Sequence, residues 1–178
     1  MAVGEVRPGY ELWRPNREKA QSVTTKFVVV LLLLASAGLA LIVTVGGWSL
    51  LEGGGGMGVV CVAWVLLYVV FAYYVFRWNR GVLPVAAAFA ILLLIFAAVA
   101  APSWFARDKS GFEDASLPVP LLGTFLILLI PLQILLIAVA MIAFNQDWHV
   151  EEERPIGSGE DYGAGSGPEP DEPETQPA

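Results

Sequence analysis

Four long uncharged apolar segments limit what this chain can fold into. They cover residues 27–51, 57–76, 82–101 and 118–144, and none of them contains Asp, Glu, Lys, Arg or His. A helix needs about 20 apolar residues to cross a hydrocarbon core roughly 30 Å thick. Each segment is long enough to do so. The sequence therefore predicts an all-α integral membrane protein, a four-transmembrane-helix bundle.

The connections between these segments differ in length. Residues 52–56 read Glu-Gly-Gly-Gly-Gly, a tight reversal that should make the first two helices antiparallel neighbours. Pro102 should end the third helix and begin the one sizeable loop, residues 102–117. Residues 1–26 form a polar N-terminal segment. Residues 145–178 form an acidic tail, and its composition from about residue 155 predicts disorder because it buries too little apolar surface.

The distribution of Lys and Arg predicts the orientation. Eight of the ten such residues lie in the N-terminal segment, at 77–80 or in the C-terminal segment, and only Arg107 and Lys109 lie in the other connections. Cytoplasmic loops carry the excess of Lys and Arg. We therefore expect a cytoplasmic N-terminus, a cytoplasmic acidic tail and an extracytoplasmic 102–117 loop. The Ala- and Val-rich, Lys-poor composition favours a bacterial inner (plasma) membrane.

Composition argues against several functional classes. The net charge is −7, whereas nucleic-acid binding requires clustered Lys and Arg, so we expect no nucleic-acid partner. The single histidine, His149, cannot supply the two ligands of a bis-His haem. The single cysteine, Cys61, cannot form an intramolecular disulfide. No hydrolase, zincin or P-loop motif is present. We expect no catalysis by this chain alone, no cofactor and no metal site.

Gln133 is the one amide in the middle of an apolar segment, and Pro131 lies just before it. Proline crowds the carbonyl four residues earlier and removes a donor, so a kink is expected there. A kink beside a buried amide suits a site for a quinone or a partner helix. The simpler interpretation is a hydrogen bond between helices, and we favour it.

An aromatic stripe runs along residues 57–76. Trp64, Tyr68 and Phe71 are spaced by four and three residues, which places them on one helix face. Such a face can stack against a quinone or a lipid. Packing against neighbouring helices is the commoner use of such a face, and we favour it.

The 102–117 loop combines aromatic and charged side chains, namely Trp104, Phe105, Arg107, Asp108 and Phe112. The favoured interpretation places the aromatic rings at the outer membrane interface and the charges in water. The alternative is a docking surface for another membrane subunit or an outer soluble protein, because aromatic residues beside arginine are common in binding hot spots.

These features suggest a non-catalytic accessory or assembly subunit of a larger membrane complex, with respiratory complexes among the candidates by analogy of architecture. Its partners would be the lipid bilayer and other membrane subunits or further copies of itself. The alternative is a small oligomeric transporter or channel, for which only Ser36, Thr44, Thr124 and Gln133 offer polar lining. A membrane-embedded enzyme is the least favoured hypothesis.

Overall fold

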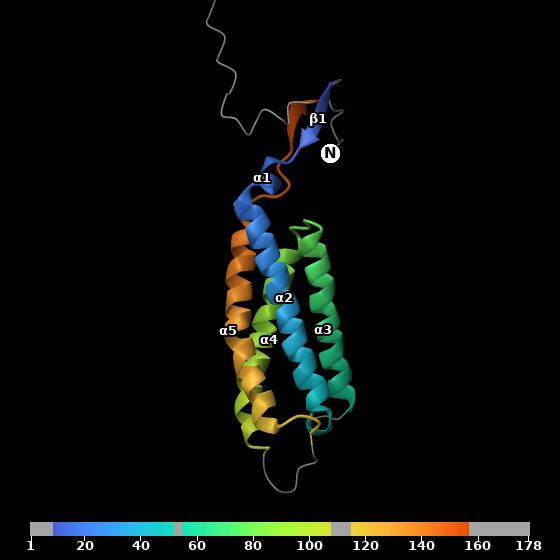
Figure 1. Ribbon diagram of the computed structural model, residues 1–178, viewed down its shortest axis with the longest axis vertical. Helices are drawn as coiled ribbons and strands as arrows, with labels where there is room; N and C mark the ends of the chain where they lie inside the picture. Colours follow the sequence, from blue (N-terminus) through green and yellow to red (C-terminus); the bar gives the residue numbers. More distant parts are fainter. Residues whose placement is uncertain (1–8, 52–54, 108–114, 157–178) are drawn as a thin grey trace, which may run out of the picture. The chain divides into compact units, whose positions relative to one another are not determined.

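The computed structural model describes residues 9–51, 55–107 and 115–156, and its contacts divide the chain into two compact units. One unit is formed by residues 16–149, and the other combines residues 1–15 with 150–178. In chain order the elements are β1 (Tyr10–Trp13), α1 (Pro15–Glu18), α2 (Ala20–Gly46), the 3-10 helix η1 (Trp48–Leu50), α3 (Gly55–Phe76), α4 (Val82–Phe105), α5 (Val119–Phe144) and β2 (Glu152–Pro155) (Figure 1).

Four of these helices, α2 to α5, are long and apolar enough to cross a membrane. The shortest, α3, has 22 residues, which corresponds to a length of about 33 Å. The prediction of four membrane-spanning helices is therefore confirmed at the level of length and composition. The chain is mostly helical, and its four apolar helices indicate a multi-pass membrane protein.

The larger unit packs its long helices side by side (Figure 1). Helix α2 packs against α3 and α5, and α5 also packs extensively against α4. Small side chains occur where these helices meet: Ala86, Ala90, Ala97 and Ala101 on α4 are all buried. Their spacing of four residues keeps each pair on one face and lets a neighbouring backbone approach closely.

The first apolar helix is shifted relative to its predicted range of 27–51. It begins at Ala20, so about two more polar turns precede the apolar segment, and it ends at Gly46. Glycine is a poor helix former, and two stand in succession here. A Cβ at Gly47 would come within 2.2 Å of the Trp104 ring, so this close approach requires glycine. The chain then continues as η1.

The third helix does not end at Pro102 as expected. Helix α4 continues to Phe105, and residues 102–105 therefore belong to the helix and not to the loop. Proline removes a single backbone donor here. The last turn is supported by the Ser103 hydroxyl, which donates to the carbonyl of Ala100 at 2.8 Å. It also buries Trp104.

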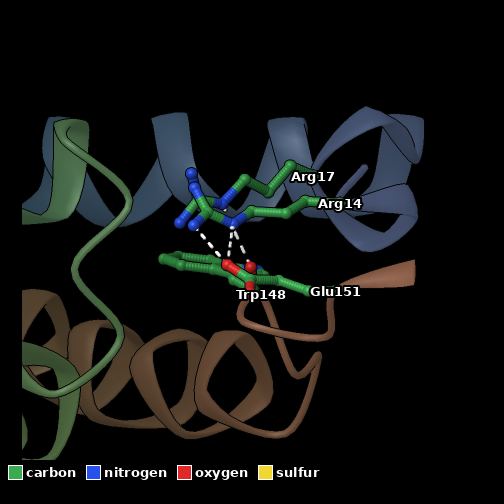
Figure 2. Close-up of polar contacts among 4 residues, drawn as sticks. All are labelled: Arg14, Arg17, Trp148 and Glu151. Atoms are coloured by element: carbon green, nitrogen blue, oxygen red, sulfur yellow. Dashed lines mark hydrogen bonds and ion pairs between the residues drawn. The ribbon is translucent and has the colours of Figure 1, made fainter. Parts of the chain in front are cut away.

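The smaller unit contains a two-stranded antiparallel sheet, which the prediction of an all-α protein missed. Tyr10 pairs with Pro155 and Trp13 with Glu152. Two ion pairs join the same segments. Arg154 donates to Glu11 at 2.7 Å, and the Nε of Arg14 donates to Glu151 at 2.9 Å (Figure 2).

The structure describes only the first two residues of the segment predicted to be disordered, Pro155 and Ile156. Pro155 is the last residue of β2, and the backbone N–H of Ile156 donates to the carbonyl of Gly9 at 2.9 Å. Residues 157–178 lie outside the described part of the chain.

Candidate functional site

A chain of hydrogen bonds crosses the middle of the helical unit. The Tyr68 hydroxyl on α3 donates to Oε1 of Gln133 on α5 at 2.9 Å. The Nε2 of Gln133 donates to the Ser36 hydroxyl on α2 at 2.8 Å, and that hydroxyl donates to the carbonyl of Leu32 at 2.7 Å. All three side chains are at most 1% exposed. We call Ser36, Tyr68 and Gln133 the central polar triad.

The triad joins three helices through one amide. Hydrogen bonds between membrane helices contribute about 0.6–2 kcal/mol each, so this arrangement matches the favoured interpretation of Gln133 as an interhelical link. Pro131 lies on the exposed side of α5, which remains helical through that position. Pro131 and Gln133 therefore do not face a common site.

The aromatic stripe of α3 packs mainly on α4. The Trp64 ring lies 5.0 Å from Phe89 and 5.9 Å from Phe96, and Phe71 lies 5.4 Å from Phe89 between ring centroids. These tilted and edge-to-face geometries are those that aromatic pairs prefer. The aromatic side chains of the stripe therefore pack against α4, and Phe89 is their main contact. The sequence shows Phe89 only as one more aromatic residue in an apolar segment.

The residues predicted to lie in the 102–117 loop differ in their exposure. Trp104 is 3% exposed and packs against Gly47, so the expectation that it lies at the outer interface is wrong for this residue. Its burial follows from the continuation of α4, which directs the ring into the bundle. Arg107 is also buried, with its guanidinium carbon 4.8 Å from the centre of the Trp104 ring.

Phe105 remains partly exposed on the last turn of α4. One edge of its ring packs against Gly123 of α5, where a Cβ would come within 2.9 Å of a ring carbon. Asp108 and Phe112 lie outside the described residues. Among the predicted loop residues that the structure describes, Trp104, Phe105 and Arg107, Phe105 is the one placed where it can meet lipid or another protein.

A cluster that sequence reasoning missed lies at the opposite end of the bundle. Lys26 is on the first turns of α2, yet it is only 7% exposed. Its ammonium nitrogen lies 4.2 Å from the centre of the Trp78 ring, 4.8 Å from Phe27 and 4.9 Å from Phe76. Cation–π contacts contribute about 0.5–2 kcal/mol each, and more when the charge is desolvated. The three rings thus compensate part of the cost of burying this cation.

Trp78 and Trp148 form the aromatic base of this cluster. Their rings meet edge to face at 5.1 Å, and Trp148 is completely buried. The Arg17 guanidinium lies 5.8 Å from the Trp78 ring and donates to the Trp148 carbonyl at 3.0 Å (Figure 2). We call Arg17, Lys26, Trp78 and Trp148 the basic aromatic cluster.

Polar contacts surround the basic aromatic cluster. Arg80 forms an ion pair with Asp147 at 2.6 Å and donates to the carbonyl of Phe144 at 2.6 Å. Oε1 of Gln146 accepts hydrogen bonds from Thr25 and Trp148, whereas its buried Nε2 has no acceptor among the described residues. In the sequence, a Trp between Arg77 and Arg80 indicates an interface segment at this end of the helix. Nothing in the sequence indicates that Lys26 packs against it.

Comparisons with known proteins add no relative. The chain matches no protein-family model, no curated protein and no solved structure. Within residues 9–51, 55–107 and 115–156, no group of three or more His, Cys, Asp or Glu side chains is placed to hold a metal ion.

Proposed function

We propose that this chain is a non-catalytic accessory or assembly subunit of a larger membrane complex. The central polar triad is the observation that supports this proposal best. Gln133, the most polar side chain in the middle of the spans, has both of its polar atoms bonded to other helices. Its hydrogen bonds serve to hold the bundle together and are not directed at a substrate path.

The outward faces of the spans supply the surface that such a subunit needs. Large apolar side chains are exposed on them, including Leu66 and Tyr73 on α3 and Val99 on α4, of which Val99 is 73% exposed. Apolar faces of this kind pack against lipid or against helices of another membrane protein. A respiratory complex remains the class that we would examine first.

The transporter alternative receives less support from these side chains. Ser36, Thr44 and Gln133 are buried inside one copy and do not face a surface shared between copies. Thr124 is exposed, but its hydroxyl donates to the carbonyl of Pro120 in its own helix at 2.8 Å. We rank an oligomeric transporter second and a membrane-embedded enzyme third.

Affinity purification in mild detergent tests the proposal. The full chain, with an affinity tag, should co-purify with other membrane subunits in fixed ratio, as measured by mass spectrometry and by absorption spectra of any redox group they carry. Elution as a lone monomer would contradict the proposal. Ion flux through liposomes containing only this chain should stay at background, and robust flux would favour the transporter alternative instead.

We also propose that both termini are cytoplasmic and that the membrane is a bacterial inner membrane. The bias of eight cations against two supports this orientation. The pairing of β1 with β2 supports the same arrangement, because an even number of crossings brings both strands to one side of the membrane.

Single cysteines introduced into a Cys61→Ala background test the orientation. Ser116 and Asn79 are exposed in connections at opposite ends of the spans. Ser116→Cys should react with an impermeant maleimide in intact cells, and Asn79→Cys only after permeabilisation. The reverse pattern would invert the assignment.

A further inference from the structure

We propose that the basic aromatic cluster is a binding site for the phosphate of an anionic phospholipid headgroup. Arg17 and Lys26 would supply the positive charge, and the Trp78 ring would position both cations. This inference is independent of the proposed accessory role, because it rests on residues at one end of the bundle and not on the central polar triad.

The contacts of the Lys26 ammonium are the main evidence for an anionic ligand. An ammonium group carries three N–H donors. The contacts of this one are the faces of three aromatic rings, and within the described part of the chain it has neither a carboxylate nor a hydrogen-bond acceptor. Ring faces attract a cation, but they do not replace an oxygen acceptor. A phosphate oxygen would supply both the acceptor and the opposite charge.

A second cation lies beside the same ring. Arg17 and Lys26 approach Trp78 at 5.8 and 4.2 Å from its centre, so two positive groups share one indole. Asp147, an acid of the same end of the bundle, is bonded to Arg80 at 2.6 Å. Two cations beside one ring could together bind a phosphate, which accepts charge-assisted hydrogen bonds from both arginine and lysine.

A further donor in the same region is unsatisfied. The Gln146 oxygen already accepts from the indole N–H of Trp148 and from the hydroxyl of Thr25, which fixes the orientation of the amide. Its Nε2 is buried and has no acceptor within residues 9–51, 55–107 and 115–156. The Gln146 Nε2 therefore adds one unsatisfied N–H donor next to the basic aromatic cluster, and an anion could accept its hydrogen bond.

The backbone at this end adopts an uncommon conformation at two residues. Trp78 has a φ of 62° and Asp147 a φ of 47°, in the left-handed region that side chains other than glycine rarely enter. At Trp78 the conformation belongs to the C-terminal cap of α3, where the N–H of Trp78 donates to the carbonyl of Val75 at 2.9 Å and that of Asn79 to Tyr74 at 3.0 Å.

The location favours a lipid over free phosphate. Phe27 and Phe76 contact the Lys26 ammonium, and each ring is 50% exposed at the end of an apolar helix. Aromatic rings at that depth sit beside the headgroups and the start of the acyl chains. Basic pockets between membrane helices on the cytoplasmic side bind anionic headgroups. A lipid would cover the exposed rings as well as meet the cations.

Native mass spectrometry of the full chain with added lipid tests this proposal. We compare phosphatidylglycerol with phosphatidylcholine of the same acyl chains, at equal concentration in a neutral detergent. The wild-type chain should retain the anionic lipid at least about fivefold better, the effect of one cation near an anionic surface. Millimolar inorganic phosphate should not displace it.

Matched variants locate the site. Lys26→Met keeps the length of the side chain and removes the charge, and it should lower phosphatidylglycerol retention about fivefold. Lys26→Arg should preserve it. Lys19→Met removes an exposed cation from the start of the same region and should leave retention within about twofold of wild type. Arg17→Gln provides a second loss of charge if Lys26→Met does not fold, as judged by circular dichroism.

Three results would overturn the proposal. The first is equal retention of the two lipids by the wild-type chain. The second is an equal effect of the Lys19 and Lys26 substitutions, which would indicate general attraction of anionic lipid. The third is complete displacement by inorganic phosphate, which would make the site one for free phosphate.

Discussion

Replacing Gln133 with leucine should destabilise the helical unit by about 2–4 kcal/mol. The substitution keeps a similar volume but removes the bonds to Tyr68 and Ser36, at 2.9 and 2.8 Å. Two hydrogen bonds between membrane helices contribute about 1.2 kcal/mol at the measured average of 0.6 kcal/mol each. The Tyr68 hydroxyl also loses its buried acceptor, which costs about 1–3 kcal/mol. The Ser36 hydroxyl keeps its bond to Leu32, so no comparable cost arises there.

A double-mutant cycle separates these contributions. Tyr68→Phe should cost about 1–2 kcal/mol because Gln133 then lacks a donor at its oxygen. The double variant should cost less than the sum of the two single changes, by about 1 kcal/mol, since neither partner is left unsatisfied. Thr124→Val is the matched control. Its hydroxyl is exposed and bonds only within α5, so the stability should stay within about 0.5 kcal/mol of wild type.

Reversible unfolding in mixed micelles measures these differences. The mole fraction of sodium dodecyl sulfate is raised while circular dichroism reports helix and tryptophan fluorescence reports packing. Wild-type stability of Gln133→Leu would refute the claim that the triad joins the helices. Strict additivity of the two substitutions would refute the bond between Tyr68 and Gln133.

Two further predictions concern the ends of the helices and of the chain. Gly47→Ala should destabilise the bundle by about 1–3 kcal/mol in the same unfolding assay, because the added Cβ meets the buried Trp104 ring. Gly38→Ala has open space around its Cβ and should be neutral or stabilise α2 by up to about 1 kcal/mol, so a loss of stability equal to that of Gly47→Ala would contradict the packing argument. Deleting residues 157–178 should leave membrane insertion and the slow hydrogen exchange of β1 unchanged, whereas deletion from Glu151 should accelerate the exchange of β1 amides by removing β2. Unchanged exchange after the longer deletion would show that the sheet does not form in solution.

The four helices were predictable because hydrophobicity alone determines which segments cross a membrane. Their ends were less predictable, because they depend on contacts with other segments. Pro102 is a standard signal for the end of a helix, yet α4 continues for three more residues and buries Trp104. The same ring packs against Gly47 at the end of α2, a contact that no local sequence pattern reveals.

The candidate sites, too, were only partly predictable, because their partners come from distant parts of the sequence. Gln133 stands out in the sequence as an amide in an apolar segment, but its partners Ser36 and Tyr68 are 97 and 65 residues away. Lys26 reads as an ordinary charged residue before a span, and only the packing of α2 against α3 surrounds it with aromatic rings. The strands β1 and β2 have four residues each, too few to give a clear alternating pattern.

The sheet formed by β1 and β2 has a consequence for the order of synthesis and folding. Glu11 and Arg154 are 143 residues apart and separated by all four spans. Because ribosomes complete the N-terminal strand first, β1 stays unpaired until the residues of β2 have been synthesised. Its edge amides are then open to other chains or proteases. β1 can pair with β2 only after all four long helices have been synthesised, so the sheet forms late in the folding of the chain.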